Sequence, residues 1–81
     1  MFYTYILYSE STHKYYVGST QNMEDRLRRH NSDHSKSTKG KGPWKVIYFE
    51  EHITRGEAVK LEQKIKKRGA KRFLEDKAQS G

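Results

Sequence analysis

Two short runs of aromatic and β-branched residues at the start of the chain restrict what it can fold into. Residues 2–8 and 14–19 are both typical of strands, and the polar segment 9–13 between them is typical of a turn. The pattern therefore predicts an antiparallel β-hairpin. A chain of 81 residues, 32% of them hydrophobic, has room for a single domain with a thin core around this hairpin.

The rest of the chain predicts three helices and one more strand. The first helix begins at Met23, and the other two cover about residues 55–68 and 70–78. The strand covers residues 44–49. Asn22 suits an N-cap, Thr54 and Glu57 have the spacing of a capping box, and Gly69 suits a helix end. We therefore expect an α+β fold, a small three-stranded antiparallel sheet flanked by helices, in the order β-β-α-β-α-α.

The charge balance indicates a polyanionic partner. Seventeen Lys and Arg residues against ten Asp and Glu residues give a formal net charge of +7, and nucleic acid is the commonest partner of so basic a surface. The absence of cysteine excludes disulfides, thiolate nucleophiles and cysteine-based zinc sites. Because no apolar run approaches the roughly 20 residues of a membrane span, we expect a cytoplasmic protein without a membrane partner.

Two tyrosines and a glycine in the hairpin have a spacing that strand packing alone does not require. Tyr5 precedes Tyr16 by eleven residues, and Gly18 follows two positions later. Alternation along a strand places Tyr16 and Gly18 on the same face. A missing side chain beside a phenol would let a phosphate approach closely, although tyrosine is also a common half-buried strand residue.

Three further side chains are candidates for phosphodiester chemistry. Arg26 and His30 share one face of the first helix, and the planar guanidinium of arginine fits a pair of phosphate oxygens. Glu62 lies at the edge of the apolar face of the second helix, among lysines. It either pairs with Lys66 four residues later or binds a divalent cation, since Mg²⁺ needs only one or two protein carboxylates.

A segment without apolar residues, 31–43, predicts a long exposed loop. Its lysines and one lysine of the second helix are candidates for contacts with phosphates, which position a nucleic acid without reading its sequence. These predicted contacts are made by Lys36, Lys39, Lys41 and Lys66.

Together these residues resemble the GIY-YIG nuclease domain. Tyr5, the Tyr16-Val17-Gly18 triplet, Arg26, His30 and Glu62 occur in the order and approximate spacing of that family. Segments 15–20 and 24–31 carry the most specific part of a resemblance that extends from about residue 3 to residue 65. The chain looks most similar to the small stand-alone GIY-YIG proteins of bacteria.

Two departures from the family pattern matter. The first motif is Tyr3-Thr4-Tyr5 in place of Gly-Ile-Tyr, so only its tyrosine carries over. Many family members also use an asparagine near the C-terminus, whereas the only asparagines here are Asn22 and Asn31. The family's basic or histidine position after the first helix corresponds to His34, Lys36 or Lys39.

The resemblance implies a metal-dependent endonuclease that hydrolyses phosphodiester bonds in nucleic acid, most readily DNA, with low sequence specificity. A tyrosine would help to deprotonate water, assisted by His30 or a loop lysine, while Arg26 stabilises phosphate charge and Glu62 holds one Mg²⁺ or Mn²⁺ ion. Whether Tyr5 or Tyr16 takes the proton stays open at this point. We expect Tyr5 and Tyr16 to lie side by side on adjacent antiparallel strands. Arg26, His30 and Glu62 should line the same concave surface. So thin a core is also compatible with a homodimer through an exposed sheet or helix face.

Two other functions fit the same composition. In a non-catalytic nucleic-acid-binding module, Tyr5, Tyr16 and Trp44 would stack on bases while lysines hold phosphates. In a small basic ribonucleoprotein component, only the charge would matter and the tyrosines would be core.

Overall fold

The computed structural model describes residues 1–32 and 40–80. Three antiparallel strands form one sheet with the spatial order β2-β1-β3. The strands are β1 (Phe2–Ser9), β2 (Lys14–Thr20) and β3 (Trp44–His52), and the helices are α1 (Met23–Asn31), α2 (Arg55–Arg68) and α3 (Ala70–Ser80). The order β-β-α-β-α-α and the α+β class are as predicted. The predicted positions His34, Lys36 and Lys39 lie outside the described residues.

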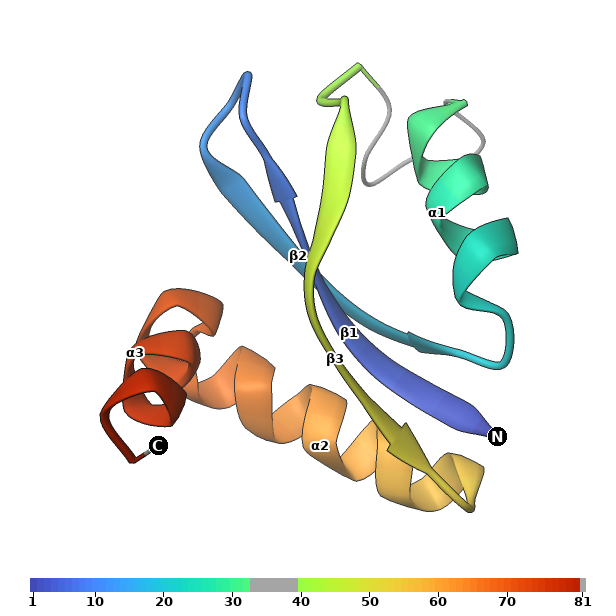
Figure 1. Ribbon diagram of the computed structural model, residues 1–81, viewed down its shortest axis with the longest axis vertical. Helices are drawn as coiled ribbons and strands as arrows, with labels where there is room; N and C mark the ends of the chain where they lie inside the picture. The colour runs from blue at the N-terminus through green and yellow to red at the C-terminus, as the bar shows by residue number, and fades with distance from the viewer. Residues whose placement is uncertain (33–39, 81) are drawn as a thin grey trace.

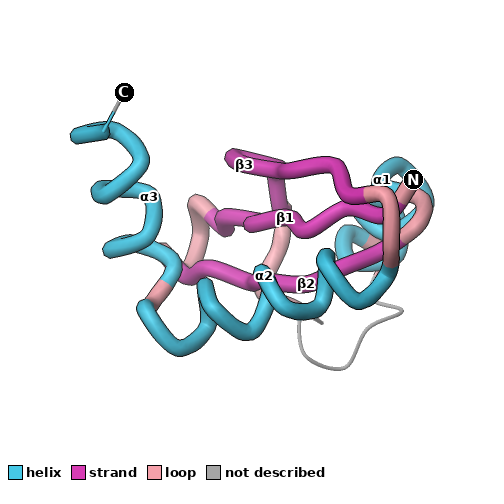
Figure 2. The backbone as a smooth tube through the Cα atoms, turned by 90° about the horizontal axis from the view of Figure 1, so that it is seen from below, coloured by secondary structure: helices cyan, strands magenta, loops and turns pink. Residues whose placement is uncertain are grey.

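The helices cover both faces of the sheet (Figure 1). On one face, Ile6 and Val17 pack against Ile65 of α2 and Phe73 of α3. On the other face, α1 covers a second cluster through Met23 and Leu27, which pack against residues of β1 and β3. Alternation along β1 explains the two clusters, because Ile6 points to one face while its neighbours Tyr5 and Leu7 point to the other. Figure 2 shows α2 running along the sheet and α3 turning away at its end.

Local signals place the helix ends where the sequence predicts them. The Asn22 side chain accepts a hydrogen bond from the Asp25 backbone N–H at 2.9 Å, which caps α1. Thr54 caps α2 in the same way, and Gly69 ends α2 with a φ of 98°. Within the described residues, none of these helices has the length and hydropathy to span a membrane.

One strand is longer than predicted. The sequence favours an end of β3 at residue 49, because Glu50 and Glu51 follow as exposed acids, but β3 continues to His52. These residues pair with Thr4, Tyr3 and Phe2 of β1, so the backbone ladder extends the strand beyond the apolar run.

Candidate active site

The two candidate tyrosines meet on the face of the sheet that α1 covers. Their ring centroids lie 6.4 Å apart. The residue directly opposite Tyr5 is Gly18, and Tyr16 faces Leu7, so the two tyrosines are not a directly facing pair, but the prediction that they lie side by side as close neighbours on adjacent antiparallel strands is confirmed. They contact diagonally, which long aromatic side chains can do. Tyr5 is only 1% exposed, whereas Tyr16 is half-buried and lines an open groove.

Gly18 makes room for the phenol of Tyr5. A Cβ atom at position 18 would lie 2.5 Å from the Tyr5 hydroxyl oxygen and 2.8 Å from its Cζ atom. The space left by the missing side chain is therefore filled from within the protein. The prediction that a phosphate approaches through this space is wrong, because Tyr5 occupies it.

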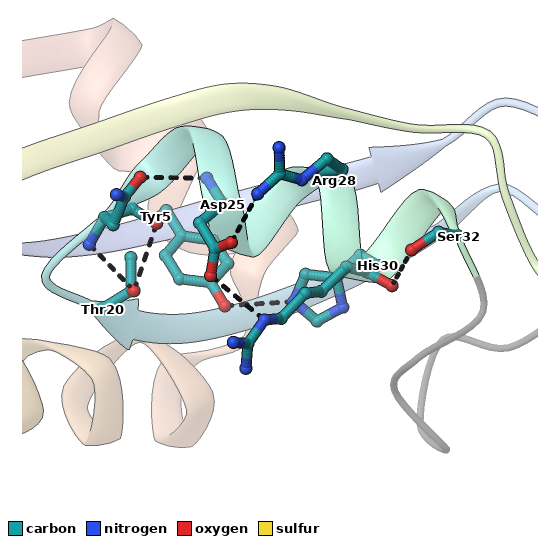
Figure 3. A network of polar contacts seen from close by, with 8 residues as sticks. Tyr5, Thr20, Asp25, Arg28, His30 and Ser32 are labelled. Carbon is teal, nitrogen blue, oxygen red and sulfur yellow. Dashed lines mark hydrogen bonds and ion pairs between the residues drawn. The ribbon is translucent and has the colours of Figure 1, made fainter.

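His30 completes a buried aromatic cluster with both tyrosines. Its Nε2 atom lies 3.2 Å from the Tyr5 hydroxyl oxygen, and its ring centroid is 4.6 Å from that of Tyr16. Figure 3 shows the Tyr5 hydroxyl directed at the His30 ring. Burial, reinforced by the positive charge of Arg26, lowers the pKa of His30. A neutral His30 with its proton on Nδ1 accepts the hydrogen bond from Tyr5.

Tyr5 is held in its protonated form. Burial raises its pKa, and the neighbouring Tyr16 and Glu62 act in the same direction, while Arg26 acts against them. A buried phenol with a raised pKa is a poor proton acceptor for water. The phenol of Tyr5 is therefore buried and protonated, and that of Tyr16 is the more accessible of the two.

The lowered pKa of His30 predicts that stability falls in mild acid. The unfolded chain binds a proton at His30 near pH 6.5, whereas the folded chain does so only at lower pH. The contribution of His30 to stability is thus fully present above about pH 6.5 and is lost as the pH falls through and below that value. Thermal unfolding between pH 7.5 and 5.5 should show a decrease in melting temperature that is smaller in His30→Gln. The exposed His13→Asn variant should keep the full decrease, and an equal decrease in His30→Gln would contradict this account.

Arg26 lines a basic cleft of about 430 Å³ where the end of β2, the start of α1 and the start of α2 meet. Arg29 and Arg55 line the same cleft. Arg29 pairs with Asp25 at 3.0 Å, but across residues 1–32 and 40–80 Arg26 itself makes no ion pair. Hydrogen bonding from Arg28 holds the pKa of Asp25 below its usual range, so this acid stays charged and orders the arginines around it (Figure 3).

Glu62 reaches the site from the opposite face of the sheet. Its helix α2 packs on the face away from Tyr16, so the prediction that Glu62 shares one surface with the tyrosines is wrong as stated. The outer edge of β2 is uncovered by any strand, because β1 is its only strand neighbour in the described sheet. Glu62 approaches this edge, where its carboxylate accepts a hydrogen bond from Ser19 at 2.8 Å. Its negative charge also contributes to the raised pKa of Tyr5. Ser19 follows Gly18, which lies opposite Tyr5, so the edge strand β2 connects Glu62 to the tyrosine cluster.

The Glu62 carboxylate fits the ligand chemistry of a weakly held divalent cation. One oxygen accepts from Ser19, and the other lies 2.8 Å from the Lys66 ammonium, as expected for the alternative pairing of Glu62 with Lys66. The Glu62 side chain is 18% exposed, whereas that of Lys66 is 55% exposed and can move away. A carboxylate and a hydroxyl beside an anionic substrate suit Mg²⁺, which keeps several of its waters. No cluster of three or more metal-binding side chains occurs among the described residues.

Neither asparagine replaces the family's C-terminal one. Asn22 caps α1. Asn31 holds the start of β3, because its side chain accepts from the Trp44 N–H at 2.6 Å and donates to the Trp44 carbonyl at 3.1 Å. The exposed Lys41, predicted to contact phosphate, is fixed through its backbone carbonyl, which accepts hydrogen bonds from Ser9 and Ser11.

Comparison with known proteins identifies the family of this chain. A family model described as the GIY-YIG catalytic domain matches residues 1–75. The chain belongs to the GIY-YIG family. This is a nuclease-type hydrolase family, and membership suggests nuclease activity for this GIY-YIG protein.

The GIY-YIG protein resembles small proteins of several bacteria. It is 38% identical over 65 residues to the UPF0213 protein OB0043 of Oceanobacillus iheyensis, covering 79% of this chain and 74% of that protein. It is 41% identical over 68 residues to the UPF0213 protein CPE1444 of Clostridium perfringens, covering 83% and 72% of the two chains. The solution NMR structure of the UPF0213 protein BH0048 from Bacillus halodurans is 25% identical, with a TM-score of 0.59, and the alignment covers 100% of this chain and 87% of that chain.

Sequence reasoning missed two contributors to this region. Ser19 donates to Glu62, and Arg55 lines the basic cleft beside Arg26. The sequence signal that could have identified Ser19 is its position directly after Gly18. No local pattern marks Arg55, because its place depends on how the start of α2 packs beside the end of β2.

Proposed function

We propose that this GIY-YIG protein is a divalent-metal-dependent endonuclease that hydrolyses phosphodiester bonds in nucleic acid, with DNA as the substrate. The observation that carries this proposal is the position of Arg26. Its guanidinium, which has no ion-pair partner among the described residues, shares a cleft with Ser19, whose hydroxyl binds the Glu62 carboxylate. A phosphate in the cleft would therefore lie between a cation that fits its oxygens and an acid that fits a metal ion.

Each residue then has a role that follows from its surroundings. Tyr16 is the accessible phenol and takes a proton from the attacking water. Tyr5 and His30 fix the ring of Tyr16 by contact from the buried side. Arg26 binds the phosphate and stabilises the charge that develops on it, so positioning and electrostatics supply most of the rate.

Glu62 and Ser19 are the groups that would hold the metal ion. Bound there, a divalent cation supplies Lewis-acid stabilisation of charge on the phosphate and leaving oxygens. The Glu62 carboxylate binds the hydroxyl of Ser19 on the edge strand β2, while Lys66 compensates its charge in the absence of a cation. The cationic side chains of the cleft contact phosphates rather than base edges, which gives the low sequence specificity that we propose.

We expect purified protein to convert supercoiled plasmid to the nicked circular form in Mg²⁺ or Mn²⁺, and EDTA to abolish the conversion. The physical reason is that the negative charge on the phosphate and leaving oxygens is stabilised by the cation, and the anionic Glu62 carboxylate cannot replace it. Gel electrophoresis of plasmid after incubation checks this, with a structured RNA as a parallel substrate. Plasmid that stays supercoiled in every divalent metal, while still binding the protein, would favour the non-catalytic binding module.

A further inference from the structure

A second groove, distinct from the arginine cleft, lies at the other end of β2. It has a volume of about 710 Å³ and is formed by the start of β2 and the junction between α2 and α3. Tyr15, which is 37% exposed, gives it an aromatic wall, and its ring is supported from behind by Tyr8 at a centroid distance of 5.1 Å. Five cations also line this groove, namely Lys14, Lys66, Arg68, Lys71 and Arg72.

Three of these five cations are available to an external anion. Arg68 is committed to Asp76 through two hydrogen bonds of 2.9 and 3.1 Å, and Lys66 is paired with Glu62. By contrast, Lys14, Lys71 and Arg72 make no ion pair within the part of the chain that the structure describes. The groove therefore carries positive charge that the carboxylates of Glu62 and Asp76 do not balance.

Two of these cations lie at the positive end of a helix dipole, where a positive charge is unfavourable. Lys71 and Arg72 lie in the first turn of α3, which contains no acidic residue. The N-terminus of a helix is its positive end, so cations there are locally unfavourable, whereas the basic end of α2 is favourable. A local conflict of this kind is typical of positions kept for function rather than for stability.

We propose that this second groove binds the sugar-phosphate backbone of the nucleic acid to one side of the scissile phosphate, which itself lies in the arginine cleft. This inference rests on the proposed function. Glu62 lies between the two, because its partner Lys66 lines the groove and its partner Ser19 lines the cleft. At a rise of about 3.4 Å per residue, the edge of β2 from Lys14 to Ser19 measures roughly 17 Å. That length corresponds to roughly five phosphates of one strand along a duplex axis.

Binding of a fluorescein-labelled 20-base-pair DNA duplex tests this proposal by fluorescence anisotropy, in EDTA so that the DNA stays intact. The triple variant Lys14→Gln, Lys71→Gln, Arg72→Gln should lose at least about tenfold in affinity at 0.1 M salt. The slope of log affinity against log salt should decrease by up to about 2.7, since each lost phosphate contact accounts for about 0.9.

A charge-matched control separates a specific groove from general basicity. Lys60, Lys64 and Lys67 follow one another on the exposed face of α2, away from β2. Their triple replacement by glutamine removes the same charge and should lower affinity by about threefold or less. An equal loss in the control and the groove variant would overturn the proposal.

Thermal unfolding distinguishes a role in binding from a role in stability, because only loss of a stabilising residue should lower the melting temperature. Removing two cations from the first turn of α3 should leave the melting temperature unchanged or raise it by a few degrees. A groove variant that binds weakly and also melts well below the wild type would overturn the proposal. Binding that depends on the groove, in a protein that never cuts DNA, would uphold this inference and reject the endonuclease. Cleavage with an unchanged KM in the groove variant would do the reverse.

Discussion

Glu62→Gln is expected to leave the protein folded and to lower its rate of phosphodiester cleavage by at least about a hundredfold. Glutamine keeps nearly the same volume and helix propensity, and its carbonyl oxygen can still accept the hydrogen bond from Ser19. It has no anionic oxygen for a divalent cation. Stabilisation of charge by the cation is worth several kcal/mol, and each 1.36 kcal/mol corresponds to a factor of ten in rate.

The measurement is the initial rate of plasmid nicking by wild type and variant at saturating Mg²⁺, together with thermal unfolding of both. Glu75→Gln is the matched control, because Glu75 is an exposed helical acid without an ion pair in the described structure. It should cut at the wild-type rate. Anisotropy should show that Glu62→Gln binds DNA at least as tightly as wild type, since the groove loses a negative charge. Nicking by Glu62→Gln at the wild-type rate would remove Glu62 from the site and leave it as the partner of Lys66.

The elements of this fold could be predicted because their signals are local. Asn22, Thr54 and Gly69 each satisfy backbone groups within a few residues, so the ends of α1 and α2 follow from the sequence itself. The strands of the hairpin are marked by their residue types. The extension of β3 to His52 could not be read in the same way, because it depends on pairing with the distant β1.

The arrangement of the candidate site was less predictable, because it depends on which face each helix covers. The pattern of α2 shows which of its own sides is apolar, and Glu62 lies beside that side as expected. It does not show which face of the sheet α2 will occupy. The two faces are equally apolar candidates, with Ile6 on one and Leu7 on the other. Glu62 is connected to the tyrosines through the edge strand β2, where its partner Ser19 follows the glycine that lies opposite Tyr5.

Cross-strand partners were equally hard to predict. Alternation correctly places Tyr16 and Gly18 on one face, but the register of the hairpin decides that Gly18 lies opposite Tyr5. The glycine was therefore assigned to a ligand, whereas its space is used by the protein.

Gly18→Ala should destabilise the protein by about 2 kcal/mol, a decrease in melting temperature of about 10 °C for a domain of this size. The new methyl group would lie 2.5 Å from the Tyr5 hydroxyl oxygen, so the buried ring must shift and weaken its contact with His30. We also expect cleavage to fall at temperatures where the variant is folded, because Tyr5 and His30 position Tyr16. Gly56→Ala is the control, since its Cβ would meet only the Thr54 hydroxyl at 4.0 Å, and alanine in a helix gains up to about 1 kcal/mol.

A double-mutant cycle connects the loss to the Tyr5 phenol itself. Tyr5→Phe removes the hydroxyl oxygen that lies nearest to the new methyl group, although the ring carbon Cζ stays at 2.8 Å. Gly18→Ala should therefore cost less in a Tyr5→Phe background than in the wild type, with a coupling free energy of about 0.5 kcal/mol or more between the two positions. Chemical denaturation of the four proteins measures this coupling. Strictly additive costs would mean that Gly18 tolerates no side chain for a reason other than Tyr5, such as the backbone of β2. The glycine would then no longer explain how the buried tyrosine, His30 and Tyr16 are held together.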